Sequence, residues 1–219
     1  MFAVIFEVMP KPGRRDDYLA LGKFLKPEIE KIDGFIDNER FTSRRSEGRV
    51  LSLSTWRDEK AVIRWRTLGV HHQVQEKGRL QIFRDYHLRV GEFTADSKPE
   101  AQNLPQQRFD ETEVGNAKCV TISELAPDPG EKPKSTDLAA DLGLAGESAR
   151  GLLDHDVYES VYNPGKLLLL ASWRDAAAGS AWQPVASGGA LRHRQVRIIR
   201  DYGMFDRREA PQYYPDAAR

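Results

Sequence analysis

Two histidines and two glutamates are the residues of this chain best suited to acid–base chemistry. His71 and His72 follow Trp65 by six and seven positions. An unperturbed imidazole has a pKa near ~6.5, so it can take a proton from a phenolic or enolic substrate. If a helix continues past Gly69, seven steps of about 100° return His72 to the face of Trp65. The alternative is an exposed or capping histidine pair where that helix breaks.

Glu7 and Glu124 stand 117 positions apart, each near the end of a run that is typical of a buried strand. A buried carboxylate is costly unless it is paired or protonated. Each could therefore be a general base with a raised pKa, lining the space between helices and sheet. The alternative is a structural ion pair with an arginine such as Arg40 or Arg89. Glu39, in the next predicted strand, is a further candidate for binding substrate.

Trp65 and Tyr86 are the aromatic candidates for binding a ligand. An indole could stack on a flat substrate, and a phenol hydroxyl could orient one, although large aromatic residues are also common in cores. No third histidine or acid at a suitable spacing argues for a metal, so none is expected. The single cysteine, Cys119, lies in an apolar run and is expected to be an inert strand residue.

An internal repeat positions these candidates. The stretch "LSLSTWRDEKAVIRW" from Leu51 recurs as "LLLASWRDAAAGSAW" from Leu168, and both tryptophans of each stretch are shifted by 117 positions. A chain of 219 residues with this duplication is expected to form two units of ordinary domain size.

Hydrophobic periodicity predicts the same element order in each unit. Alternating or continuous apolar runs predict strands and three-to-four spacing predicts helices. In the first unit we expect strands at 2–8, 35–44, 49–56 and 80–93, with helices at 13–34, interrupted at Pro27, and at 57–69. In the second we expect strands at 118–125, 151–163, 166–173 and 194–205, with helices within 134–146 and 174–182.

The predicted fold class is α+β, with two tandem ferredoxin-like β-α-β-β-α-β units packed sheet to sheet as a pseudo-dimeric α/β barrel. The units are 1–95 and 117–219, joined by a polar linker at 96–116. Alternatively, each unit could pair with a unit of another chain, and a homodimer is compatible with either packing. The C-terminal tail, with Tyr213 and Tyr214, is expected to dock onto the partner unit.

Charge and hydropathy exclude some classes of partner. There are 33 Lys and Arg residues against 33 Asp and Glu residues, and the sequence pI is about 7.0. This balance gives no electrostatic reason to expect nucleic acid or an anionic membrane. No apolar run has the length of a membrane helix, and the N-terminus is apolar before it is basic, the reverse of a secretory signal. A cytoplasmic protein is expected.

The first unit resembles the antibiotic biosynthesis monooxygenase family. The resemblance rests on "AVIFEV", "IDGFIDNERF", "LSLSTWRDEKAVIRWR", the histidines that follow, and "GRLQIFRDYHLRV". It implies a dimeric α/β barrel, a pocket beside Trp65 and a histidine at the position of His71. Haem-degrading members of this family carry Asn, Trp and His where this chain has Glu7, Trp65 and Gln75. Since glutamine cannot replace the imidazole as an iron ligand, haem is disfavoured.

The resemblance implies a cofactor-independent monooxygenase that acts on a small aromatic or quinol-like molecule. His71, His72 or Glu7 would remove a proton, and the resulting carbanion would reduce O₂ without a metal or flavin. One alternative is a non-catalytic member that binds a small hydrophobic molecule, and a second is haem degradation. The second unit has no equivalent of His71 and His72, so a histidine-based site is expected in the first unit.

Overall fold

The computed structural model describes residues 1–98, 104–128, 137–185, 189–215 and 217. The first half contains four strands, three helices and one wide π-helical turn. In chain order these are β1 (Phe2–Pro10), α1 (Arg15–Ile29), β2 (Phe35–Ser43), β3 (Val50–Trp56), α2 (Glu59–Thr67), α3 (Gly69–Lys77), η1 (Gly78–Ile82) and β4 (Phe83–Asp96). The order β-α-β-β-α-β is the predicted one, with the second helix divided into α2 and α3.

The second half repeats the strands with much shorter helices. Its elements are β5 (Cys119–Ala126), α4 (Leu138–Asp141), a 3₁₀ turn η3 (Gly146–Ala149), β6 (Leu152–Ser160), β7 (Leu167–Trp173), α5 (Ala176–Ala181) and β8 (Ala190–Gly203). Of the helix expected within 134–146, the structure has the four residues of α4; residues 134–136 lie outside the described part of the chain.

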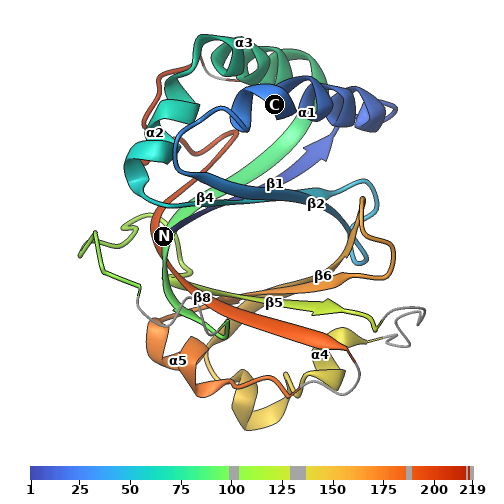
Figure 1. Ribbon diagram of the computed structural model, residues 1–219, viewed down its shortest axis with the longest axis vertical. Helices are drawn as coiled ribbons and strands as arrows, with labels where there is room; N and C mark the ends of the chain where they lie inside the picture. Colours follow the sequence, from blue (N-terminus) through green and yellow to red (C-terminus); the bar gives the residue numbers. More distant parts are fainter. Residues whose placement is uncertain (99–103, 129–136, 186–188, 216, 218–219) are drawn as a thin grey trace.

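The eight strands form a closed barrel in the order β1-β3-β2-β6-β7-β5-β8-β4. The two halves join along β4 and β8, which pair from His87–Gly203 to Asp96–Arg194, and along a short seam between β2 and β6 at Phe41–Ser160. Helices α1 to α3 cover one outer face and α4 and α5 the opposite one (Figure 1). The predicted face-to-face packing is therefore confirmed, and the barrel closes within one chain.

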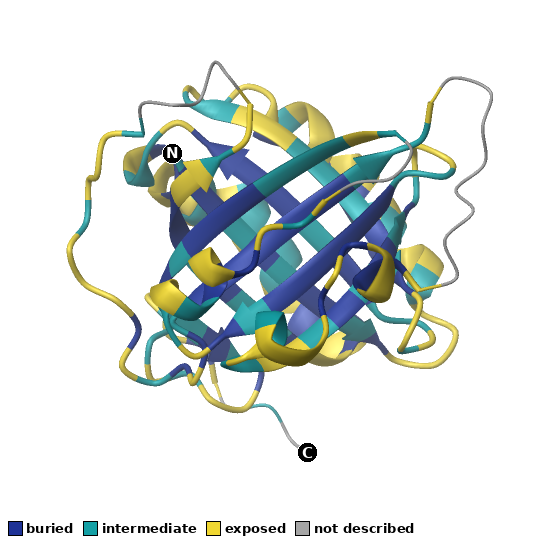
Figure 2. Cartoon of the chain, turned by 90° about the horizontal axis from the view of Figure 1, so that it is seen from below, coloured by how far each residue is buried: buried dark blue, intermediate teal, exposed yellow. Residues whose placement is uncertain are grey.

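The interior of the barrel is filled by side chains from both halves. Because residues alternate between the two faces of a strand, every second residue of β1 points inward. Buried apolar residues from all eight strands meet there: Ala3, Ile5, Phe41, Leu51, Leu53, Phe93, Val120, Ile122, Tyr158, Leu168, Leu170, Val196 and Ile198. Figure 2 shows the strands as the most deeply buried part of the molecule. The barrel centre is thus a packed hydrophobic core.

The repeated Trp-Arg-Asp sequence makes the same structure twice. Trp56 and Trp173 end β3 and β7, and both are fully buried. Two residues later, Asp58 and Asp175 cap α2 and α5, each carboxylate accepting a hydrogen bond of 2.8 Å from a backbone N–H three residues on. An aspartate at this position pairs an otherwise unsatisfied donor of the first helical turn.

The helical layers of the two halves differ, and this difference creates the main cavity. In the second half the short helices lie directly on the sheet, and Trp182 is buried against Trp173 and Leu142. In the first half Trp65 remains partly exposed beneath longer helices. The space that Trp182 and its neighbours fill in one half is therefore open in the other.

The prediction that Pro27 interrupts the first helix was wrong, whereas the break in the second helix is one of the alternatives that the sequence left open. Pro27 does not interrupt α1, which ends two residues later at Ile29. A proline in the last turn removes one backbone hydrogen bond, whose acceptor at the exposed Lys23 can reach water. The second helix does break: Leu68 adopts an extended conformation with ψ of 127°, and α3 starts at Gly69. Among the described residues, no helix has the length and apolar character of a membrane span.

The C-terminal tail docks on the first half, as predicted. After β8 the chain turns away from its own sheet and passes beside α3, where the Tyr214 hydroxyl lies 3.0 Å from His72 Nδ1. The amide of Gln212 donates to the carbonyl of Arg66 over 2.9 Å, and Arg79 donates to the carbonyl of Pro215 over 3.1 Å. The tail thereby becomes part of the wall around the main cavity.

Candidate functional site

The main cavity lies between the sheet of the first half and helices α1 to α3. Its volume is about 910 Å³. Both halves of the chain line it, because the turn between β6 and β7 and the C-terminal tail reach across. The side chains used below include Phe6, Tyr18, Arg40, Trp65, His71, Gln75, Arg79, Tyr86, Arg207 and Tyr214. Apolar and aromatic surface with a few polar groups is typical of a small-molecule site.

His71 is the histidine that meets Trp65. Because the helix breaks at Leu68, the continuous-helix argument that favoured His72 does not hold. The His71 imidazole stacks on the Trp65 indole, with ring centroids 4.0 Å apart and planes inclined by 16°. His71 Nδ1 lies 2.9 Å from the carbonyl oxygen of Trp65. A carbonyl can only accept, so Nδ1 carries the proton and Nε2 presents a lone pair.

The environment of His71 keeps the imidazole neutral. Burial lowers the pKa of His71 to about 4, outweighing the hydrogen bond to Trp65, which raises it. No described residue forms a hydrogen bond with His71 Nε2. A neutral imidazole with a fixed tautomer and a free nitrogen at a cavity wall can accept a proton from a bound molecule.

His72 lies on the other side of α3 and is held by the tail. Its ring stacks on that of Tyr214 at 5.2 Å, and Nδ1 lies 3.0 Å from the Tyr214 hydroxyl. The same hydroxyl donates to Gln75 Oε1 over 2.8 Å. Gln75, which replaces the iron-binding histidine of haem-degrading members, is thus engaged by Tyr214. His72 helps to hold the tail in place and does not line the cavity.

An aromatic floor forms the base of the cavity. Phe6 on β1 packs against Tyr18 at 6.4 Å and against Tyr86 at 5.5 Å, and Phe83 contacts all three rings. These side chains point to the helical side of the sheet, with Val8 and Ile82 buried around them. Of the predicted binding residues, Trp65 and Tyr86 therefore line the same cavity as His71.

Glu7 points into the barrel and is separated from the cavity by its own strand. It follows Phe6, so its side chain lies on the opposite face of β1. Arg89 donates to its carboxylate over 2.6 Å and the Tyr158 hydroxyl over 2.6 Å. Burial by itself would raise the pKa of Glu7, but Arg89 and Tyr158 outweigh it and the pKa is lowered. The expectations of a raised pKa and a place between helices and sheet were wrong; the ion pair with Arg89 is the alternative that holds.

Glu39 is also absent from the cavity and closes the opposite mouth of the barrel. Its carboxylate accepts from Lys166 over 2.6 Å and from the Ser160 hydroxyl over 2.5 Å. Lys166 also reaches Glu124 over 2.5 Å, and Glu124 pairs with Arg194. The nearby cations lower the pKa of Glu124 despite its burial. Glu7 and Glu124 thus have matching structural roles in the two halves.

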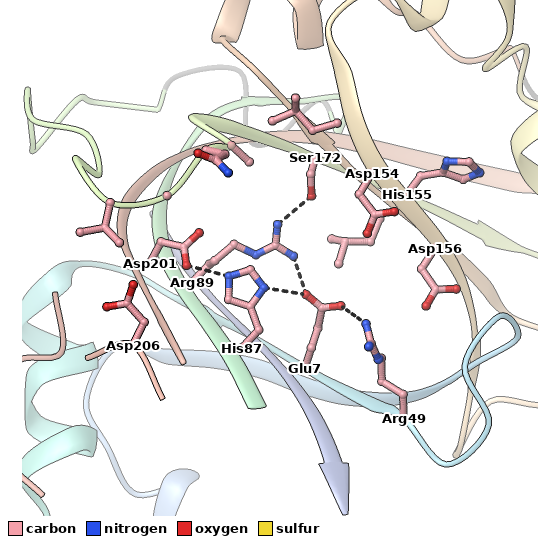
Figure 3. A pocket seen from close by; sticks show the side chains of 16 residues that line it. Glu7, Arg49, His87, Arg89, Asp154, His155, Asp156, Ser172, Asp201 and Asp206 are labelled. Atoms are coloured by element: carbon pink, nitrogen blue, oxygen red, sulfur yellow. Dashed lines mark hydrogen bonds and ion pairs between the residues drawn. The ribbon is translucent and has the colours of Figure 1, made fainter. Parts of the chain in front are cut away.

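A second, smaller cavity of about 350 Å³ lies at the barrel mouth that contains Glu7 (Figure 3). Its charged groups are largely paired with one another. His87 bridges Asp201 at 2.7 Å and Glu7 at 3.7 Å, and Arg89 also donates to Ser172 over 2.8 Å. The described residues contain no group of three or more histidines, cysteines or acids arranged to hold a metal.

Sequence reasoning missed the arginines of the main cavity. Arg40 lies 5.9 Å from the Tyr18 ring, while Arg79 and Arg207 surround Tyr86 at the other end of the floor. None of these three forms an ion pair with a described carboxylate. The arginines of the tail are visible in the sequence, but their convergence with Arg79 depends on the path of a chain segment that starts in the other half.

Known proteins share the sequence and the fold of this chain. The model of the family described as antibiotic biosynthesis monooxygenase matches residues 1–77 and 120–184, one segment in each half. A jasmonate monooxygenase from Pyricularia oryzae (strain 70-15) is 46% identical over 224 residues, which cover 100% of each chain.

Two solved structures are similar over most of the chain. An aldoxime dehydratase in complex with butyraldoxime has a TM-score of 0.53 and 11% sequence identity, covering 90% of this chain and 79% of its own. An anthrone oxidase-like protein has a TM-score of 0.37 and 12% identity, covering 96% of both chains. At this identity the dehydratase supports the shared fold only.

Proposed function

The chain belongs to the antibiotic biosynthesis monooxygenase family, and on this premise we propose that it oxidises a small, mainly apolar molecule with O₂. The site is the main cavity of the first half. The favoured substrate is jasmonate or a close analogue, in place of the aromatic substrate expected from the sequence. The observation that carries the proposal is His71, a partly buried, neutral imidazole with a free nitrogen at the wall of a large, mainly apolar cavity.

Two observations support this class of substrate. The jasmonate monooxygenase is similar over its full length at 46% identity. Jasmonate is a small, non-aromatic molecule with a ring ketone, an apolar side chain and one carboxylate. The cavity supplies aromatic and aliphatic surface for the apolar part and unpaired guanidinium groups near its walls.

His71 would act as the general base in this proposal. A hydrogen on a carbon next to a ketone is acidic because the resulting negative charge moves onto the carbonyl oxygen. His71 Nε2 would take this proton, and the imidazolium would be held by its Nδ1–H bond to Trp65. Stacking on Trp65 fixes the ring plane, so the lone pair stays directed at the bound molecule.

The oxidation balances without an external reductant. The carbanion gives electrons to O₂, and recombination with uptake of a proton yields a hydroperoxide on the same carbon. Loss of water from this hydroperoxide leaves a new carbonyl group. One oxygen atom of O₂ remains in the product and the other leaves as water, and the substrate supplies all the electrons.

The test combines oxygen uptake with product analysis. The purified chain is mixed with jasmonate in aerobic buffer without reductant, and the product is examined by mass spectrometry. We expect a product with one oxygen gained and two hydrogens lost. His71→Gln should lower kcat by about a hundredfold or more while the Kd for jasmonate stays close to that of the wild type. His155→Gln, a histidine outside the cavity, is the matched control.

Two other outcomes would contradict parts of this proposal. A product that gains one oxygen without losing hydrogen, formed only when a reductant is added, would show that the carbanion route is wrong. Tight binding of jasmonate without oxygen uptake under any condition would favour the non-catalytic binding protein.

A further inference from the structure

Two guanidinium groups donate to a single phenol oxygen at one end of the main cavity. Arg79 Nη1 lies 2.8 Å from the Tyr86 hydroxyl oxygen, and Arg207 Nη1 lies 2.5 Å from the same atom. Both groups also lie over the ring of Tyr214, at 5.3 Å and 5.2 Å. Two positive charges are therefore held close together, and Arg79 is almost completely buried.

No described side chain neutralises this pair. The other acceptors of Arg79 and Arg207 are backbone carbonyls, of Pro215 and Gln212. Burial raises the pKa of Tyr214 to about 12, so this ring stays uncharged. Buried charges in proteins are normally paired, because removing an isolated ion from water is very unfavourable.

The hydrogen-bonding capacity of this cluster points into the cavity. Each guanidinium has five N–H donors, of which Arg79 and Arg207 each use two in the hydrogen bonds above. The Tyr86 oxygen accepts from both arginines, so its own O–H is free to donate to a third group. Arg66, also at the cavity wall, has a buried Nε with no hydrogen-bond partner. The cluster thus offers several donors and no negative charge.

From this geometry we infer that Arg79, Arg207 and Tyr86 form an anion site that binds the carboxylate of the substrate. This inference rests on the proposed function for the identity of the substrate. The apolar part would then extend over Phe6 toward Trp65 and His71. Arg207 comes from the second half and Arg79 from the first, so the site is complete only when the tail is docked. This gives the second half, whose own helical layer is filled, a direct role in recognition.

Arg40 is the competing position for a carboxylate. It lies beside Tyr18, beyond Phe6 from Tyr86, and it too forms no ion pair with a described acid. A single guanidinium can bind both oxygens of a carboxylate, but the Arg79–Arg207 pair brings two positive charges and more donors to the same point. The pair is therefore the better anion site.

The experiment compares a free acid with its ester. Dissociation constants for jasmonate and methyl jasmonate are measured by calorimetry on the full chain and on the variants Arg207→Gln, Arg79→Gln, Arg40→Gln and Arg208→Gln. We expect wild type to prefer the acid. Arg207→Gln should weaken the acid by about ten- to hundredfold and leave the ester nearly unchanged. Arg208, exposed and paired with Asp206, is the matched control and should keep the preference.

The outcomes separate this inference from the proposed function. Loss of the acid preference in Arg40→Gln but not in Arg207→Gln would overturn the inference, as would wild-type chain that binds neither compound or both equally. Acid-selective binding that depends on Arg207 without oxidation would support the anion site and refute the monooxygenase. Because Arg79→Gln could disturb the tail, Arg207→Lys serves as a second variant and should recover part of the preference.

Discussion

Replacing His71 by phenylalanine should change how the stability of the protein depends on pH. Phenylalanine can keep the stack on Trp65 but cannot take up a proton. In the wild type the pKa of His71 falls from an ordinary value of 6.5 to about 4, because the ring is buried. Below pH 6.5 the unfolded chain therefore binds a proton that the folded chain does not.

The sign and size of the effect follow from this shift. A depressed histidine pKa favours the folded state fully above pH 6.5, and this contribution is lost as the pH falls toward 4. Each pKa unit corresponds to about 1.4 kcal/mol, so the full contribution is about 3 kcal/mol, of which about 2 kcal/mol is lost by pH 5. At neutral pH the variant should be less stable by about 1 kcal/mol, since it lacks the hydrogen bond to the Trp65 carbonyl.

The measurement is urea unfolding of wild type and His71→Phe at pH 7, 6 and 5. The difference in the free energy of unfolding should move by about 2 kcal/mol in favour of the variant between pH 7 and pH 5. Burial also lowers the pKa of His193 to about 4, but His193 is present in both proteins and its contribution cancels. A difference that stays constant with pH would refute the lowered pKa of His71 and with it the neutral imidazole.

Three further predictions concern the barrel and the tail. Arg89→Met should lower the free energy of unfolding by about 3 kcal/mol, because the buried carboxylate of Glu7 loses its nearest cation and keeps only Arg49 at 3.8 Å. The double variant with Glu7→Leu should recover much of this loss in the same urea assay. Cys119 should resist a thiol reagent such as DTNB in the native protein and react once urea unfolds it, because the thiol is buried and burial raises its pKa to about 11. Rapid reaction of Cys119 with DTNB in the native protein would contradict this. Tyr214→Ala should raise the KM for jasmonate by about tenfold, with little change in the melting temperature, because it removes part of the cavity wall and the contact with His72. An unchanged KM would argue against the tail as part of the site.

Much of the architecture could be predicted from the sequence because it depends on local patterns that occur twice. The Trp-Arg-Asp repeat predicts two equivalent units, and the structure shows the same arrangement in both: a buried tryptophan at a strand end, Trp56 or Trp173, and an aspartate that caps the next helix, Asp58 or Asp175. Two bare sheet faces in one chain lead to the closed barrel, since each face must bury its apolar side chains.

The candidate site was only partly predictable. Trp65, His71 and Tyr86 do line one cavity, and the resemblance to a known family indicated the first two of these positions. His72 could face Trp65 only if the helix continued past Gly69, and the extended conformation of Leu68 breaks that helix. After such a break, a shift of one residue in the start of the next helix decides whether His71 or His72 contacts Trp65.

The sequence by itself determined the duplicated unit, its strand order and the residues able to carry a charge or a proton. The tertiary structure decided which of these residues share a site. Glu7 and Phe6 are neighbours in the chain, yet they lie on opposite faces of β1, one in the barrel and one in the cavity. Arg79 and Arg207 are far apart in the chain and meet at Tyr86. The alternation of side chains along a strand is a local property that can be predicted from the sequence. Which face of the sheet is covered, and by which segment, depends instead on contacts between the two halves.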